Sequence, residues 1–293
     1  MNTRDLLFAF AALLPLPPQS AAQESPTLRK IAETGVISIG FRDKSIPFSY
    51  LDKQQRPTGY SIELCYRIVD AIRTRLKAPG LEVMLRPVTS ANRSAFMVNG
   101  IVDLECGSTT NTLERQKEVA FSVTTFVAAT SLVAKKTARI DSLQALKGST
   151  VVSTAGTTAI NALGETAQAQ GLDLHIIPGR DHAEAFSLVE ADRALAFVMD
   201  DVLLHGLVAA AKDPAMYAIA ATDLPVQPYG IVVRKNDPEF KKLVDEAIVA
   251  LFKSGEVQQI YRKWFAPLQL PMSPALKKAI AAPTDSGDPA AYR

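Results

Sequence analysis

The sequence predicts an α/β fold made of two successive units in which strands alternate with helices. Short apolar runs of strand length, such as residues 36–41 and 194–199, are bounded by polar residues. Between such runs, apolar side chains recur at helical spacing, as they do across residues 62–76. This alternation is typical of a sheet whose strands are joined by crossover helices.

The first unit is predicted from apolar periodicity and from helix end signals. Gly100 closes a short helical stretch, and Asn111 with Glu114 three residues later resembles a capping box, so we expect a helix to start there. The predicted elements are strands at residues 36–41, 82–88 and 101–106, and helices at residues 62–76, 91–99 and from 111 onward.

The second unit repeats the pattern, and a long helix opens at Asp237-Pro238 and stops at Gly255. The predicted strands lie at residues 125–135, 150–153, 174–177, 194–199 and 229–234, and the predicted helices at residues 141–147, 158–170, 185–190, 202–212, 238–254 and around 260–265. The tail beyond, rich in Ala, Pro and Asp, is expected to be a loose end.

Composition excludes several classes of protein. The chain has 293 residues, of which 47% are hydrophobic and 21% charged, which is ordinary for a globular chain. The net charge is only +2 and Lys and Arg are spread along the chain, which argues against a nucleic-acid groove. No Cys or His spacing suggests a metal site, and we expect no cofactor.

The N-terminus resembles a secretory signal. Arg4 precedes an apolar run at residues 6–14, and small residues lead up to Ala22, which predicts cleavage after Ala22. The run is far shorter than the about 20 residues that span a bilayer. A buried N-terminal helix is the alternative. The signal predicts a soluble mature protein outside the cytoplasm, in the periplasm.

The two cysteines, Cys65 and Cys106, allow one intramolecular disulfide, which is plausible in an oxidising compartment. Both lie among apolar residues, so two buried free thiols are the alternative.

Polar residues follow the predicted strands, where ligands bind in open α/β sheets. The candidates are Arg42, Ser90, Arg93, Ser108, Thr110, Arg115, Thr158, His182 and Asp200. An arginine fork suits each carboxylate of an acidic amino acid, and hydroxyls and helix-start N–H groups also stabilise anions. Asp200 is the only carboxylate in this set, so it would accept the α-ammonium. The set predicts a ligand of net negative charge.

Each candidate also has an ordinary structural role. An arginine at a strand end can be a solvated surface charge, Asp200 can cap the next helix, and His182 can be a satisfied surface residue. The hydroxyls of residues 108–110 can be a helix-start cluster. The convergence of these residues, more than any single one, favours a binding site.

Longer segments carry a family resemblance that runs from about Thr27 to about Phe265. The segments are Gly40-Phe41-Arg42, Ile46-Pro47-Phe48-Ser49-Tyr50, Thr89-Ser90-Ala91-Asn92-Arg93, Glu105-Cys106-Gly107-Ser108-Thr109-Thr110-Asn111, Glu114-Arg115-Gln116-Lys117, Gly156-Thr157-Thr158, Asp181-His182, Met199-Asp200-Asp201, Tyr229-Gly230 and Lys263-Trp264-Phe265. With these segments the chain resembles the periplasmic amino-acid-binding proteins of ABC transporters, solute-binding protein family 3, and among them those for glutamate and aspartate.

The resemblance implies a two-lobed periplasmic binding protein fold of type II, two α/β domains joined by two crossing hinge strands. It implies a first lobe at residues 26–124 plus 230–270, a second at 129–226, and a C-terminal tail at 271–293 after the signal at 1–22. Residues 227–229 would form the second hinge.

The resemblance also implies roles. Arg115 with Thr110 would hold the α-carboxylate, and Asp200 with Ser108 the α-ammonium. The residues expected around the side-chain carboxylate are Arg42, Ser90, Arg93, Thr158 and His182. Ala155 departs from the pattern, since a hydroxyl residue is also seen there.

The predicted function is capture of L-glutamate or L-aspartate by a monomer and delivery to the membrane permease of an ABC transporter, with no catalytic residues. Two other hypotheses remain. A secreted dehydratase of cyclic acids on the same scaffold would use His182 or Asp200 as acid or base. A ligand-sensing module would dock on a receptor instead of a transporter.

Overall fold

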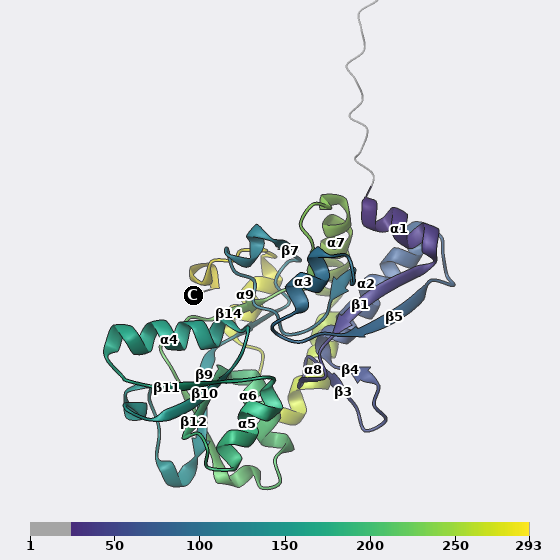
Figure 1. The fold of residues 1–293 in the computed structure, drawn as a ribbon. Helices are drawn as coiled ribbons and strands as arrows, with labels where there is room; N and C mark the ends of the chain where they lie inside the picture. The colour runs from purple at the N-terminus through teal and green to yellow at the C-terminus, as the bar shows by residue number, and fades with distance from the viewer. Residues whose placement is uncertain (1–24, 293) are drawn as a thin grey trace, which may run out of the picture.

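A computed structural model describes residues 25–292 as two lobes that lie side by side, each built around a five-stranded sheet (Figure 1). The architecture is the two-lobed α/β fold that the sequence predicted. The predicted signal at residues 1–22 lies outside the described residues.

The sheet of the first lobe has the order β5-β1-β6-β15-β7. Its strands are β1 (Val36–Phe41), β5 (Glu82–Pro87), β6 (Leu104–Glu105), β7 (Val119–Phe121) and β15 (Val232–Arg234), and the helices of this part of the chain are α1 (Pro26–Thr34), α2 (Tyr60–Leu76), α3 (Arg93–Val98), α7 (Pro238–Ser254) and α8 (Glu256–Phe265). β1 pairs in parallel with β5 and β6, so the carboxyl ends of these strands meet at one edge. A small sheet of β2 (Lys44–Ser45), β3 (Ser49–Leu51) and β4 (Pro57–Thr58) follows β1.

The sheet of the second lobe has the order β11-β10-β12-β9-β13. Its strands are β9 (Thr130–Lys135), β10 (Thr150–Thr154), β11 (His175–Gly179), β12 (Ala196–Asp200) and β13 (Tyr217–Ala221), and its helices are α4 (Thr158–Gln170), α5 (His182–Glu190) and α6 (Asp201–Ala210). β10 runs parallel to β11 and β12, so α4, α5 and α6 all start at the edge where those strands end.

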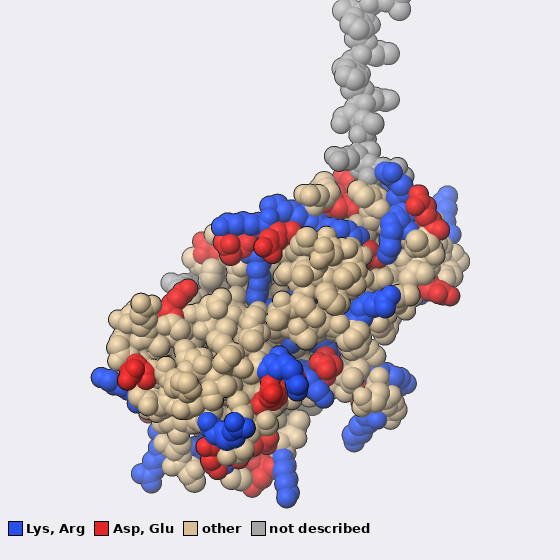
Figure 2. Space-filling model, viewed as in Figure 1, with Lys and Arg blue, Asp and Glu red and all other residues tan. Residues whose placement is uncertain are grey.

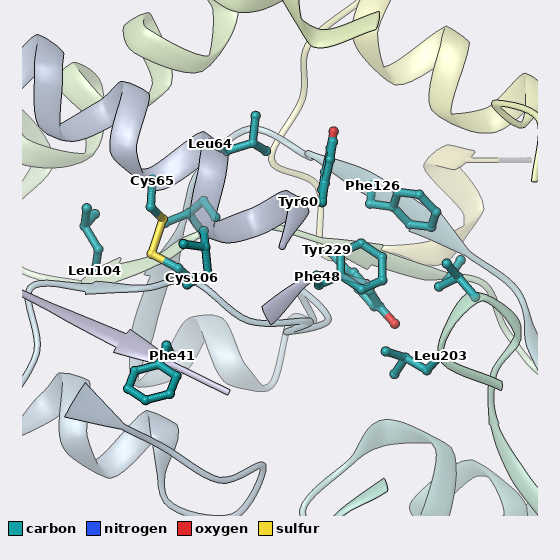
Figure 3. Close-up of a cluster of buried hydrophobic side chains, with 14 of the residues drawn as sticks. Phe41, Phe48, Tyr60, Leu64, Cys65, Leu104, Cys106, Phe126, Leu203 and Tyr229 are labelled. Atoms are coloured by element: carbon teal, nitrogen blue, oxygen red, sulfur yellow. A yellow bond between two sulfur atoms is a disulfide. The ribbon is translucent and has the colours of Figure 1, made fainter. Parts of the chain in front are cut away.

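Two short strands connect the lobes. β8 (Phe126–Ala128) and β14 (Gln227–Tyr229) pair antiparallel in a sheet of their own. Phe126 of β8 and Tyr229 of β14 belong to an aromatic cluster with Phe48 and Tyr60 (Figure 3). The cluster is buried, so the hinge strands are fixed to the core of the first lobe.

The two lobes are in close contact at two places. A Cβ atom on Gly156 would lie 2.8 Å from Cα of Ala91, and one on Gly206 would lie 2.6 Å from the carbonyl oxygen of Ile46. In both cases a glycine of the second lobe lets its backbone approach the first lobe closely. The structure is therefore closed.

The disulfide between Cys65 and Cys106 is present, so the prediction of a bridge is confirmed (Figure 3). It joins the core face of α2 to the residue that follows β6, and it closes a loop with a sequence separation of 41. Closing a loop of this length lowers the entropy of the unfolded chain and so raises its free energy by about 4 kcal/mol in the simple chain-entropy picture.

The C-terminal tail is ordered, and the expectation of a loose end is wrong. It follows η5 (Ala266–Leu268) and contains α9 (Pro274–Ala281) and η6 (Pro289–Tyr292). Ala279 and Tyr292 pack on Val127 of hinge strand β8, and the Tyr292 hydroxyl lies 2.6 Å from Oγ1 of Thr124. The segment is held by apolar and polar contacts that the sequence pattern did not reveal.

Several expected elements also differ. The strand expected at residues 125–135 is split into β8 and β9, which belong to different sheets. Instead of a helix from Asn111, the chain forms only the 3₁₀ turn η1 (Arg115–Lys117), and residues 141–147 form only η3 (Gln144–Leu146). Asn111 does not cap a helix: its side-chain oxygen accepts from Nε2 of Gln116, and its amide donates to the carbonyl oxygen of Asp285 in the tail. The stretch at residues 229–234 is split between β14 and β15.

The surface agrees with the balanced charge of the sequence. On the face shown in Figure 2, basic and acidic side chains are mixed over both lobes. None of the helices within residues 25–292 combines the length and the apolar character needed to cross a bilayer.

Candidate functional site

The predicted site residues come from both lobes and from the facing edges of the two sheets. Arg42 follows β1, Ser90 and Arg93 follow β5, Ser108 and Thr110 follow β6, and Arg115 lies in η1; from the second lobe, Thr158 starts α4, His182 starts α5 and Asp200 ends β12. The parallel strands bring these positions together, as the strand-end argument predicted.

Direct contacts join the two sets across the cleft. The guanidinium of Arg115 donates to the carbonyl oxygen of Thr110 at 2.8 Å and to that of Gly156 at 3.1 Å. Oγ1 of Thr110 lies 3.3 Å from Oγ1 of Thr158. Arg115 and Thr110 therefore lie where the first lobe meets the start of α4.

Two arginines of the first lobe are almost fully buried. Arg42 is 1% exposed and Arg93 is 3% exposed, whereas arginine is ordinarily a surface residue. Neither takes part in an ion pair within the part of the chain that the structure describes. The solvated-surface alternative is thus excluded for both.

Burial lowers the pKa of all three arginines, and repulsion from Arg93 adds to this effect at Arg42 and Arg115. Burial, together with the neighbouring charge of Arg93, lowers the pKa of Arg42 to about 10 and that of Arg115 to about 9. Burial also lowers the pKa of Arg93. A guanidinium with such a lowered pKa gains from a negative group placed beside it.

Six of the nine predicted residues carry a buried polar atom with no hydrogen-bond partner among the described residues. These atoms are Nε and Nη1 of Arg42, Oγ of Ser90, Nε of Arg93, Oγ of Ser108, Nε2 of His182 and Oδ1 of Asp200. Buried polar groups are rarely left without a partner, because each costs about 1–3 kcal/mol. Here they gather in one place and include donors for an anion and an acceptor for a cation.

His182 is held in its neutral form. Its Nδ1 lies 2.8 Å from Oγ1 of Thr154, and burial, with the charges of Arg42 and Arg93, lowers its pKa well below 6.5. Asp181 caps α5 by accepting from the N–H of Glu184, which fixes His182 at the first position of the helix. The other ring nitrogen remains for a ligand.

Asp200 is the buried carboxylate of the second lobe. Its Oδ2 accepts a hydrogen bond from the hydroxyl of Tyr229, while Oδ1 has no partner within the described chain. Burial raises its pKa to about 7, against the opposing effect of the Tyr229 hydrogen bond. Its side chain does not cap α6, so that structural alternative is wrong.

Three residues of the site were missed as site residues from the sequence. Gln227 accepts from Thr158 at 2.6 Å, and Tyr229 donates to Asp200, so both hinge-strand side chains orient candidate ligand groups. Glu105 is fully buried at the end of β6, so Asp200 is not the only carboxylate near the arginines. The run at residues 101–106 carries two acidic residues, Asp103 and Glu105, among apolar ones, and this was the available signal.

Helix starts, whose N–H groups stabilise anions, were expected after Thr110 and after Gly156, and only the second is present. After Gly156, α4 begins with Thr157 as its N-cap, and the Thr157 hydroxyl accepts from the N–H of Ile160. After Thr110 no α-helix begins. Within residues 25–292 no group of three His, Cys, Asp or Glu side chains could hold a metal ion.

The chain is similar to known binding proteins over most of its length. The family of bacterial extracellular solute-binding proteins, family 3, matches residues 37–267. The chain is 46% identical to an L-glutamate/L-aspartate-binding protein of Pseudomonas aeruginosa, over 94% of this chain and 95% of that one. It is 43% identical to a glutamate/aspartate import solute-binding protein of Escherichia coli, over 90% of this chain and 87% of that one.

A solved structure shares the fold with modest sequence identity. It is an ancestral amino acid-binding protein that is a precursor of cyclohexadienyl dehydratase, with 28% identity, a TM-score of 0.70, and coverage of 82% of this chain and 99% of that one. This match agrees with the two-lobed fold described above. The chain therefore belongs to the bacterial extracellular solute-binding proteins, family 3.

Proposed function

We propose that this protein captures L-glutamate or L-aspartate between its lobes and delivers it to the permease of an ABC transporter. The observation that carries the proposal is the set of unpartnered buried atoms on Arg42, Arg93, His182 and Asp200, together with the hydroxyls beside them. A small acidic amino acid supplies a partner for each kind of atom. The names of the relatives support the same ligand class.

The α-carboxylate is assigned to Arg115 and Thr110. A guanidinium has five N–H donors, so the two carbonyl bonds of Arg115 leave others for a carboxylate. The α-ammonium is assigned to Oδ1 of Asp200 and Oγ of Ser108, which are both buried and unpartnered. An ammonium is a donor only, so it matches these two acceptors.

The side-chain carboxylate is assigned to the pocket of Arg42, Ser90, Arg93, Thr158 and His182. Arg42 and Arg93 have unpartnered N–H groups and lowered pKa values, so a carboxylate supplies both hydrogen bonds and counter-charge. An amide in the same place would leave two buried cations without that charge. We therefore expect glutamine and asparagine to bind much more weakly.

Binding is proposed to work by lobe closure. The lobes would be the regions 26–124 plus 230–270 and 129–226, rotating about β8 and β14. Without a ligand, the three arginines repel one another and favour an open cleft. A dicarboxylate that contacts both lobes stabilises the closed form, because it binds that form better than the open one.

We propose export through the N-terminal signal at residues 1–22, which accords with an extracellular family. We also propose transport without catalysis. Both His182 and Asp200, the acid–base candidates of the dehydratase hypothesis, are engaged by neighbours that orient them for ligand contact: Thr154 and Tyr229.

Titration calorimetry with the purified mature protein tests the proposal. Glutamate or aspartate should bind with a dissociation constant near micromolar, which corresponds to about −8 kcal/mol. The bound amino acid, recovered by denaturation after hours of incubation, should be chemically unchanged. Conversion of a cyclic acid such as prephenate by the protein would support the dehydratase hypothesis instead.

A further inference from the structure

Glu105 is a buried charge at the centre of the first lobe. It is the last residue of β6, opposite Gly40 of β1 and Val232 of β15, and its side chain is fully buried. A buried carboxylate is costly unless paired or placed among cations. The groups around Glu105 therefore indicate the role of its carboxylate.

The two carboxylate oxygens differ in their contacts. Oε2 accepts a hydrogen bond of 2.6 Å from the hydroxyl of Thr109, four residues later. Oε1 is buried and has no hydrogen-bond partner in the part of the chain described. The turn at residues 105–109 thus holds the carboxylate in a fixed orientation with one oxygen still open.

The carboxylate lies beside the stem of Arg42. A Cβ atom built on Gly107 would lie 2.3 Å from Oε1 of Glu105 and 2.8 Å from Cγ of Arg42, so both groups flank the same glycine. The negative charge of Glu105 raises the pKa of Arg42, Arg93 and Arg115, in each case against the larger effect of burial. Glu105 therefore acts on all three cations at once.

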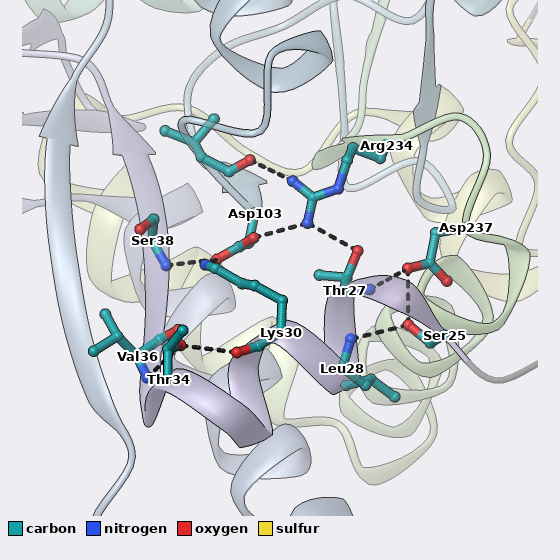
Figure 4. Close-up of polar contacts among 11 residues, drawn as sticks. Ser25, Thr27, Leu28, Lys30, Thr34, Val36, Ser38, Asp103, Arg234 and Asp237 are labelled. Atoms are coloured by element: carbon teal, nitrogen blue, oxygen red, sulfur yellow. Dashed lines mark hydrogen bonds and ion pairs between the residues drawn. The ribbon is translucent and has the colours of Figure 1, made fainter.

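A second buried carboxylate, that of Asp103, forms structural ion pairs and serves as a comparison for Glu105. Asp103, two residues earlier, binds Lys30 at 2.6 Å and Arg234 at 2.8 Å and accepts from the N–H of Ser38, as Figure 4 shows. Its oxygens are satisfied within the fold. Glu105 has no ion pair of this kind among residues 25–292.

We infer that Glu105 is a fixed counter-charge of the ligand site, which makes the closed cleft select ligands of net charge −1. The inference rests on the proposed function. Arg42, Arg93 and Arg115 supply three positive charges, and Glu105 and Asp200 supply two negative ones. One positive charge remains, which a molecule with two carboxylates and one ammonium neutralises.

This arrangement separates three ligands of similar length by charge. Glutamine has net charge 0, glutamate has −1, and glutarate, which has both carboxylates but no amine, has −2. Without Glu105 the site would carry one more positive charge. Each unit of negative charge on the ligand would then gain about tenfold in affinity, given the attenuated Coulomb interaction inside a protein.

The test compares the wild-type protein with Glu105→Gln, in which the amide oxygen can still accept from Thr109. Glutamine and glutarate are measured by displacement of radiolabelled glutamate. Relative to wild type, the variant should improve glutarate against glutamate by about tenfold and worsen glutamine against glutamate by about tenfold. Glu105→Asp, which keeps the charge, should leave both ratios near their wild-type values.

A purely structural role gives a different result. The inference is wrong if Glu105→Gln leaves the affinities of glutarate and glutamine relative to glutamate unchanged, whether or not all three affinities shift by a common factor. If Glu105→Gln does not fold, Glu105→Met repeats the charge loss without burying a polar group. Failure of the wild-type protein to bind glutamate or aspartate would overturn the proposed function itself. That outcome is distinct from unchanged ratios in the variant, which would overturn only the inference about Glu105.

Discussion

The hydroxyl of Tyr229, in hinge strand β14, donates a hydrogen bond to Oδ2 of Asp200, at the end of β12 in the second lobe. Both side chains are buried. The hinge thus orients the carboxylate and leaves Oδ1 as the acceptor for a ligand cation. The contact ties the binding site to the strand about which the lobes are proposed to rotate.

Removal of this hydroxyl should weaken ligand binding. We expect Tyr229→Phe to lower the affinity for glutamate about tenfold. Asp200 loses the hydrogen bond that orients it, and its buried Oδ2 is left without a donor. Titration calorimetry measures the change. Tyr60→Phe is the matched control, since it removes another buried hydroxyl, which donates to the carbonyl oxygen of Thr125 and not to Asp200. Equal losses in the two variants would contradict a positioning role.

The affinity for glutamate should fall as the pH drops below about 7. Burial raises the pKa of Asp200 to about 7, and only the ionised carboxylate can pair with the α-ammonium. Below that value the site must release a proton on binding, so affinity should fall toward tenfold per pH unit. His182 stays neutral in this range because its pKa is lowered well below 6.5.

Asp200→Asn provides the control for the pH dependence. The variant should bind glutamate weakly, with an affinity that changes little between about pH 5.5 and 7.5. A wild-type affinity that is constant over the same range would show that Asp200 does not titrate there or does not contact the ammonium.

The arginines should differ in what they contribute. Arg115→Ala should abolish detectable glutamate binding, because the α-carboxylate and the contact with Gly156 across the cleft are both lost. Arg93→Ala should instead reduce the preference for glutamate over glutamine, since Arg93 is assigned to the side-chain carboxylate. Exposed Arg86→Ala is the control and should change neither value. The assignment is wrong if Arg93→Ala lowers both affinities equally.

Removal of the C-terminal segment should destabilise the protein and weaken binding. Truncation after Leu270 removes the apolar cover of Val127 and the Asp285 carbonyl that holds Asn111, next to Thr110. Thermal unfolding and glutamate titration measure both effects. Tyr292→Phe, which loses only the hydroxyl contacts with Thr124 and Ser286, should cost about 1 kcal/mol and leave affinity intact. An unchanged melting temperature after truncation would contradict this account.

Elements with strong local signals could be predicted from the sequence. The strand β1 and the helices α4 and α7 have the predicted bounds. For β1 the apolar run sets them, and for the two helices the apolar periodicity, a Thr or Asp cap and a closing glycine agree. No helix starts at Asn111, whose side chain binds Gln116 and also Asp285, which is 174 residues away in sequence. No local pattern contains such a contact.

The candidate site also has residues that the sequence could predict and residues that it could not. The nine predicted residues follow strands whose parallel pairing could be expected, so their convergence at the cleft needed only the fold class. Glu105 and Tyr229 could not be placed, because their roles depend on side-chain direction inside the folded core. The open oxygen of Glu105 in particular depends on the turn that brings Thr109 onto the other one.

Calorimetric titration of the wild-type protein with glutamate, aspartate, glutamine and histidine is the most direct test of the central assignment. We predict tight binding of one or both acidic amino acids and binding of glutamine at least about a hundredfold weaker, the cost of leaving a buried cation unpaired. Clear heat with histidine or with an apolar amino acid, and none with glutamate or aspartate, would contradict it.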